Sequence, residues 1–228
     1  MRSLSQWSRD EREKLKGYSL KEKLIYIWQY YRLWIVGLGF LLGFTVYALY
    51  IYITVPGEIY FYGILSNTYA RLDKGSDFYE GFVRAAGYDL TQGEVELDCA
   101  NYCKPSERVI GNTYYEKLIS MLDGGVDDIW IAGPEDVAAI GATGRLMDLN
   151  SEQAGALRAR YGDRFVYCTP LREGYSDEPV PVGIDLSGTA LVGEYRPWPG
   201  GAALGVNAAT KRIDQVMVFL DYLFQYQG

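Results

Sequence analysis

The feature that most constrains this chain is a long apolar run close to its beginning. Residues Leu33 to Val55 read LWIVGLGFLLGFTVYALYIYITV, which is 23 residues without a charged side chain. As a helix the run is about 34 Å long, enough to cross the hydrocarbon core of a bilayer. A buried core helix is the alternative, but the short, charged segment before the run could not cover a helix that is apolar on every face. The run therefore predicts a transmembrane helix.

A cleaved signal peptide would also contain an apolar run. Here the run begins after 32 residues, is longer than the apolar part of such peptides and ends at VPGE without a small-x-small cleavage site. We therefore expect the anchor to be retained. Within it, Gly39-x-x-x-Gly43 is a helix-packing pattern, which leaves dimerisation of the anchor open.

The distribution of charge predicts the orientation of the anchor. The chain has 22 Lys and Arg against 29 Asp and Glu, a net charge of −7, yet residues 1–32 carry eight basic and only four acidic side chains. Basic residues beside a span stay on the cytoplasmic side. We expect a single-pass protein of the cell membrane with a cytoplasmic basic tail (1–19), a juxtamembrane and transmembrane helix (20–55, span 33–55) and an extracytoplasmic domain (58–228). The acidic outer domain argues against a nucleic-acid partner.

The start of the long helix has its own signal. Ser19-Leu20-Lys21-Glu22 fits a capping box, in which the serine hydroxyl and the glutamate carboxylate satisfy each other's backbone amides. The pattern predicts a helix that begins near Leu20 and enters the bilayer without a break.

The outer domain alternates between strand and helix patterns. Strands are predicted in EIYFYGILS, GEVELDCA and VDDIWIAG, and helices in DFYEGFVRAA, in NTYYEKLISMLDGG with Asn112 as its cap, and in PEDVAAIGATG. This order predicts an α/β fold, a three-layer domain with a mostly parallel sheet. Beyond Leu149 we expect a helix in SEQAGALRARYG, strands in FVYCTP, VPVGIDLSG and AALGVNA, and an amphipathic helix in KRIDQVMVFLDYLFQY.

Several of these segments together resemble a known family. The stretch YYEKLISMLDGGVDDIWIAGPEDVAAIGATGRLMDL, followed by VPVGIDLSG, ALGVNAAT and a last helix with VFLDYL, resembles extracellular solute-binding proteins of the type II periplasmic-binding class. The opening KEKLIYIWQYYRLWIVG is similar to the KEK-x-x-YIW-x-YY openings of small membrane-anchored proteins from Gram-positive anaerobes, whose functions are largely unassigned. Because two full lobes need a longer chain, the resemblance implies one main lobe with a reduced or missing second lobe.

The composition removes several classes of active site. The chain has no histidine, so Ser-His and Cys-His pairs and imidazole metal ligands are excluded, and neither a cofactor nor a metal site is predicted. Adjacent acids occur at Asp127-Asp128 and at Glu135-Asp136. Neighbours on a strand point to opposite faces, so we interpret these pairs as capping and solvated residues. They leave a carboxylate-dependent glycan enzyme as a remote alternative.

The three cysteines leave two states open. Cys99 and Cys103 could form a disulfide if the strand turns at Asn101-Tyr102, or one of them could pair with Cys168. Three reduced structural thiols are the other state.

A ligand site is predicted where strands end. Ligands of α/β sheets bind outside the carboxyl ends of the strands, where a helix amino terminus also offers free amides. This rule selects Asn67 after the first strand, Gly133, Glu135 and Asp136 after the third, and Asp185 in the returning segment. Six aromatic residues could line such a pocket, although amphipathic rings also suit the core or a membrane-proximal surface: Tyr114, Tyr115, Trp130, Tyr175, Tyr195 and Trp198.

Together these features predict a non-enzymatic, membrane-anchored protein. We expect it to resemble a solute-binding lobe and to act as a binding or accessory protein beside an integral membrane protein, with a small solute, sugar or peptide as the ligand. A structural or regulatory subunit without a small-molecule ligand is the alternative.

Overall fold

A computed structural model of the chain describes residues 13, 15–54, 57–68, 70–107, 111–171, 178–193, 198 and 200–226. The chain divides into two compact units, Met1–Val55 and Pro56–Gly228, and each is described by itself. Residues 1–12 of the predicted basic tail, and Tyr175 and Tyr195, lie outside the described residues.

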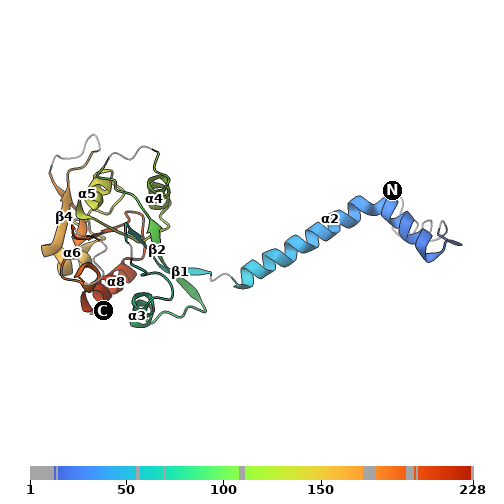
Figure 1. The fold of residues 1–228 in the computed structure, drawn as a ribbon, viewed down its shortest axis with the longest axis horizontal. Coiled ribbons are helices and arrows are strands. Elements are labelled where there is room, and N and C mark those ends of the chain that lie inside the picture. The colour runs from blue at the N-terminus through green and yellow to red at the C-terminus, as the bar shows by residue number, and fades with distance from the viewer. Residues whose placement is uncertain are drawn as a thin grey trace. The chain divides into compact units, whose positions relative to one another are not determined.

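The first unit contains one long helix, α2 (Leu20–Thr54) (Figure 1). Its predicted start is confirmed, because the Ser19 amide and hydroxyl each donate to Glu22 Oε2 at 2.8 Å and the Glu22 amide donates back to Ser19 Oγ at 3.4 Å. The helix is long and apolar enough to span a membrane, and none of its most apolar stretch is buried. This is compatible with a single-pass anchor.

The second unit is a mixed α/β domain built on one six-stranded sheet. Its strands are β1 (Glu58–Ser66), β2 (Gly93–Asn101), β3 (Ile129–Ala132), β4 (Phe165–Cys168), β5 (Val180–Asp185) and β6 (Ala203–Val206), and their order across the sheet is β2-β1-β3-β6-β5-β4. β1 pairs in parallel with β2 and β3, whereas β6, β5 and β4 follow in antiparallel pairs. The expected parallel sheet is therefore confirmed for β1–β3 only, and the sheet as a whole is mixed.

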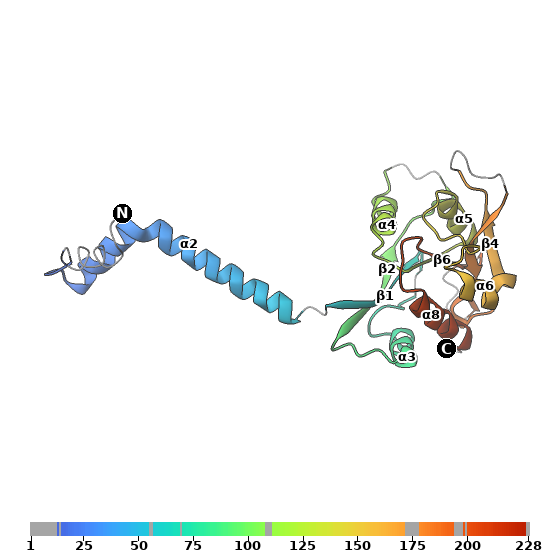
Figure 2. The ribbon, with the colours of Figure 1, turned by 180° about the vertical axis from the view of Figure 1, so that it is seen from behind.

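Helices cover both faces of this sheet (Figures 1 and 2). They are α3 (Asp77–Ala86), α4 (Thr113–Gly124), α5 (Pro134–Ala142), α6 (Gly155–Tyr161), α7 (Ala190–Gly193) and α8 (Ile213–Gln225), with a 3-10 turn at Gly162–Arg164. α3, α6, α7 and α8 pack into one apolar cluster, and α4 and α5 into a second one. The three layers of the prediction are thus present.

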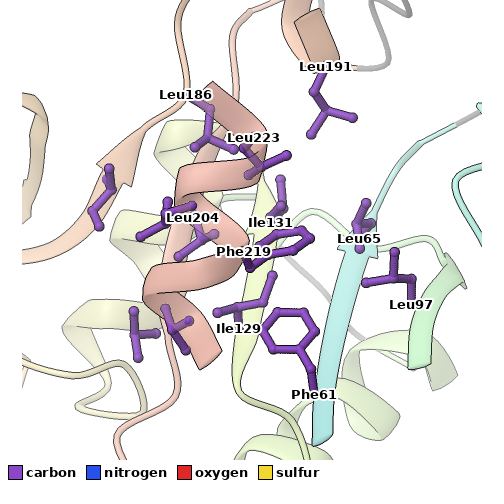
Figure 3. Close-up of a cluster of buried hydrophobic side chains, with 14 of the residues drawn as sticks. Phe61, Leu65, Leu97, Ile129, Ile131, Leu186, Leu191, Leu204, Phe219 and Leu223 are labelled. Atoms are coloured by element: carbon purple, nitrogen blue, oxygen red, sulfur yellow. The ribbon is translucent and has the colours of Figure 1, made fainter. Parts of the chain in front are cut away.

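The larger cluster is centred on α8. Phe219 of α8 lies against Phe61 of β1 and beside Ile129 and Ile131 of β3 (Figure 3), and the two phenylalanine ring centroids are 4.7 Å apart. The apolar stripe of the last helix is confirmed, since Val216, Phe219, Leu220 and Leu223 are buried.

The helix ends follow the local sequence signals. The predicted Asn112 cap is confirmed, because its side chain accepts hydrogen bonds from the amides of Tyr114 and Tyr115. Gly87 and Gly125 end α3 and α4 with φ of 69° and 61°, a left-handed conformation that glycine adopts without strain.

Candidate functional site

A cleft of about 610 Å³ lies at the carboxyl edge of the parallel half of the sheet. β1 and β3 run side by side, with Leu65 opposite Ile131, so the residues that follow both strands emerge at the same edge. The cleft is lined by Asn67, Lys104, Ser106, Glu107, Gly133, Pro134, Glu135, Asp136, Trp198, Gly200 and Gly201. Four of the five predicted ligand residues, Asn67, Gly133, Glu135 and Asp136, therefore share one cleft.

Asp185 does not line this cleft. It ends β5, and both Asp185 and Ala132 pair with Ala203 of β6, so it lies two strands from the end of β3 on the same edge of the sheet. Its Oδ1 accepts hydrogen bonds from the amide and hydroxyl of Ser187 at 3.0 and 2.8 Å. Asp185 therefore shapes its own turn.

Asn67 is the one described residue other than glycine with a positive φ, at 58°. Its amide nitrogen donates to the Asn101 carbonyl at 2.9 Å, and its Nδ2 donates to the Cys103 carbonyl at 2.5 Å. These two bonds join the end of β1 to the segment after β2. An amide nitrogen carries two hydrogens and this bond uses one of them, so the Asn67 side chain can still offer a ligand both an N–H donor and its oxygen as an acceptor.

The amino terminus of α5 forms another wall. Gly133 is its cap without a side-chain bond, Pro134 occupies the first turn, and the first backbone bond runs from the Val137 amide to the Gly133 carbonyl. The amides of Glu135 and Asp136 therefore point out of the helix end, as the amides at a helix start do.

Asp136 fixes the loop on the other side of the cleft. Its Oδ1 accepts hydrogen bonds from the Ser106 amide at 2.9 Å and from the Ser106 hydroxyl at 2.6 Å. The side chain is 7% exposed, so this contact is sheltered from water. Lys104 and Glu107 of the same loop form an exposed pair at 3.1 Å.

Trp198, which lies late in the sequence of the domain, forms a further wall of the cleft. It is 5% exposed, and its Nε1 donates to the Ser66 carbonyl at 2.7 Å. The Ser66 hydroxyl in turn accepts from Trp130 Nε1 and donates to Asn101 Oδ1, both at 2.7 Å. Ser66 thus connects the cleft wall to β2 and β3. Of the other aromatic candidates, Trp130 is fully buried in the core.

The charges of the cleft favour ligands that donate hydrogen bonds. Lys104 is basic, whereas Glu107, Glu135 and Asp136 are acidic, and Glu135 is exposed. With the Asn67 oxygen, the lining offers several acceptors, while the α5 amides offer donors. Hydroxyl groups and small zwitterions match this combination.

The loop after β2 also belongs to the cleft, although its residues are not among the predicted ligand residues. Lys104, Ser106 and Glu107 reach the cleft because β2 is parallel to β1 and ends at the same edge. Applying the strand-end rule to the second predicted strand as well would have found them.

The acids before β3 differ from their interpretation as solvated residues, since Asp127 and Asp128 are both fully buried. Arg212 Nε donates to the two carboxylate oxygens of Asp128 at 2.8 and 3.0 Å, and Asn207 Nδ2 donates to Asp127 Oδ1 at 3.1 Å. These partners, about 80 residues later in the chain, offset part of the free-energy cost of burying the two carboxylates. This cluster lies at the amino end of β3, away from the cleft.

The three cysteines are free thiols. β2 stays extended through Asn101, so the turn that a Cys99–Cys103 disulfide requires does not form, and the two side chains pack in different apolar clusters. Burial raises the pKa of the Cys103 thiol to about 11 and that of Cys99 to about 12. Both are therefore neutral thiols at pH 7.

Comparisons of the chain with protein-family models, with curated proteins and with solved structures found no match. A proposal for the function therefore depends on the residues and the charges of the cleft.

Proposed function

We propose that this chain is a single-pass membrane protein whose α/β domain binds a small solute, sugar or short peptide in the cleft and serves as an accessory protein beside an integral membrane partner. The observation that carries the proposal is the convergence of four separate segments on one cleft. They are the ends of β1 and β3, the loop after β2, and Trp198 with Gly200 and Gly201. Such sites at strand ends are where α/β domains bind ligands.

The resemblance to solute-binding lobes supports the same proposal. One lobe presents an open binding face, and a partner then takes the place of the second lobe. In this arrangement the acceptors of Asn67 and of the exposed Glu135 receive ligand hydroxyl or ammonium groups, and the α5 amides receive a carboxylate or hydroxyl oxygen.

A ligand panel tests the proposal. The full chain in detergent is titrated with amino acids, mono- and disaccharides and tripeptides, and its unfolding is followed by tryptophan fluorescence. A ligand at 100 times its Kd should raise the free energy of unfolding by about 2.7 kcal/mol. Asn67→Gly, which keeps the positive φ, and Lys104→Ala should each weaken binding, whereas Asp163→Ala on an exposed turn should not.

Other results of the panel select the alternatives. Equal binding by all three variants removes the cleft from the proposal. No binding across the panel favours a structural or regulatory subunit without a ligand. Turnover of nitrophenyl glycosides that is lost in Glu135→Gln indicates a glycan enzyme instead, because Glu107 and Glu135 line the cleft from different segments.

The orientation needs its own test. Protease added to intact cells should digest the domain after Glu58 and spare the first 30 residues, because the basic residues lie before the span. Protection of the domain would place it in the cytoplasm.

A further inference from the structure

The outer edge of β2 is a second surface of interest, separate from the cleft. β2 is nine residues long and is the last strand of the sheet on its side, next to β1 (Figure 1). Within the described part of the chain, no strand pairs with its outer edge. A long unpaired edge presents backbone donors and acceptors that can bind another extended chain.

A groove of about 380 Å³ runs along this edge. On the strand side it is bordered by five consecutive residues, Glu96 to Ala100. Successive side chains of a strand point to opposite faces, so five consecutive residues can border one groove only where it follows the backbone edge. The other residues that line it are Thr68, Ala70, Arg71, Asp73 and Tyr102.

On the side of β2 that faces away from β1, most of the backbone along the groove has no hydrogen-bond partner among the described residues. Among the described residues outside β1, the one acceptor for an amide between Glu96 and Ala100 is Asp98 Oδ1, which takes the Ala100 amide at 2.9 Å. Before the groove, the Tyr79 hydroxyl donates to the Val95 carbonyl at 3.0 Å. Among the residues that the structure describes, the outer edge therefore has partners at both ends of the groove and none outside β1 between them.

The edge strand is acidic on one face. Val95, Leu97 and Cys99 pack against the larger apolar cluster, so Glu94, Glu96 and Asp98 share the other face. Asp98 is paired with Lys117 at 2.6 Å. Glu94 and Glu96 form no ion pair with any residue that the structure describes. Partial burial, followed by the charges of Glu94 and Asp98, raises the pKa of Glu96, so a cation placed beside it would be favourable.

This charge pattern determines which kind of chain fits. A second copy that paired its β2 with this one would bring two rows of carboxylates onto the same face, and like charges opposite each other destabilise a strand pair. An extended segment with Lys or Arg at alternate positions would instead place its cations beside Glu94 and Glu96.

We propose that the β2 edge binds an extended, basic segment of a partner protein by strand addition, with the segment's backbone in the groove and its Lys or Arg side chains beside Glu94 and Glu96. Backbone hydrogen bonds supply affinity in such complexes, and the alternating side chains supply specificity. The proposal does not require a ligand in the cleft.

Designed peptides test the proposal. The full chain in nanodiscs of zwitterionic lipid is titrated into fluorescein-labelled Lys-Val-Lys-Thr-Lys-Val, with empty nanodiscs as the blank, and binding is followed by fluorescence anisotropy. The Glu-for-Lys peptide should bind at least tenfold more weakly. Two further peptides carry N-methyl groups on alternate residues. One is methylated at the odd-numbered positions and the other at the even-numbered positions. One of them should bind at least tenfold more weakly, since it loses the amides that pair with β2 while keeping its charge.

Protein variants and hydrogen exchange complete the experiment. The double reversal Glu94→Lys with Glu96→Lys should invert the preference between the basic and acidic peptides, whereas Glu152→Lys with Asp163→Lys, at exposed sites elsewhere, should preserve it. The basic peptide should slow amide exchange within Glu96–Ala100. Equal binding of both N-methylated peptides and the parent, equal binding of the acidic peptide, or no binding of the basic peptide at millimolar concentration would each overturn the proposal. So would concentration-dependent protection of β2 without peptide, which indicates self-pairing.

Discussion

The buried carboxyl group of Asp127 makes stability depend on pH in a way that one substitution can isolate. Asp127 is fully buried, its Oδ1 accepts one hydrogen bond from Asn207, and its Oδ2 has no partner among the described residues. Burial raises the pKa of this carboxyl from 3.8 to about 6, and the neighbouring Asp128 charge adds to the shift. The folded state therefore holds the proton more tightly than the unfolded chain does.

The sign and size of the effect follow from this difference. Between pH 4 and pH 6 the folded state binds more protons than the unfolded state, so the free energy of unfolding falls as pH rises. A shift from 3.8 to about 6, at 1.36 kcal/mol for each pH unit, gives about 3 kcal/mol. This contribution is present below pH 4 and is lost as pH rises through 6.

Asp127→Asn removes the titration while keeping an oxygen for Asn207. Its free energy of unfolding, relative to the native chain, should therefore rise by about 3 kcal/mol between pH 4 and pH 7.5. An amide nitrogen at the unpartnered position adds a cost that does not vary with pH, so the change with pH is the diagnostic quantity. Urea unfolding followed by near-UV circular dichroism measures it, with Asp163→Asn as the exposed control. A difference between native chain and variant that stays constant across this range refutes the reasoning.

Four further predictions concern packing and thiols. Ser66→Ala should lower the free energy of unfolding by about 1–3 kcal/mol in urea titrations, because buried Trp130 Nε1 loses its acceptor; a neutral substitution would contradict this. Gly141→Ala should cost about 1–3 kcal/mol, since a new Cβ would lie 2.4 Å from Val182 Cγ2. Gly155→Ala, which meets no atom within 4 Å, should be neutral or slightly stabilising by the same assay. Alkylation of the unfolded chain without reductant should add three groups by mass spectrometry, and two fewer would show a disulfide.

Local signals predicted much of the fold. The capping box at Ser19 and the Asn112 cap each act within a few residues, and both are confirmed. The glycines that end α3 and α4 are local signals of the same kind. The antiparallel direction of β6, unlike these helix ends, does not follow from a local signal. It depends on how the chain between Leu149 and Ala203 returns to the sheet, and no short segment encodes that route.

The candidate site divides in the same way. Asn67 and Glu135 follow predicted strands directly, so a general rule about strand ends finds them. Trp198 is one of six aromatic candidates, and the bond from its indole to Ser66, 132 residues earlier, which brings it to the cleft, appears only in three dimensions. The burial of Asp128 likewise depends on Arg212.

The place of β1 in the sheet has a mechanical consequence. The chain enters the domain from the anchor at the amino end of β1, and the cleft lies at the carboxyl end of the same nine-residue strand, about 30 Å further along it. If α2 is held in a bilayer, as proposed, a pull between it and a molecule held at the cleft would act along β1, which is bonded on both sides by parallel strands. The hydrogen bonds of both ladders would then share the load in shear instead of opening one after another.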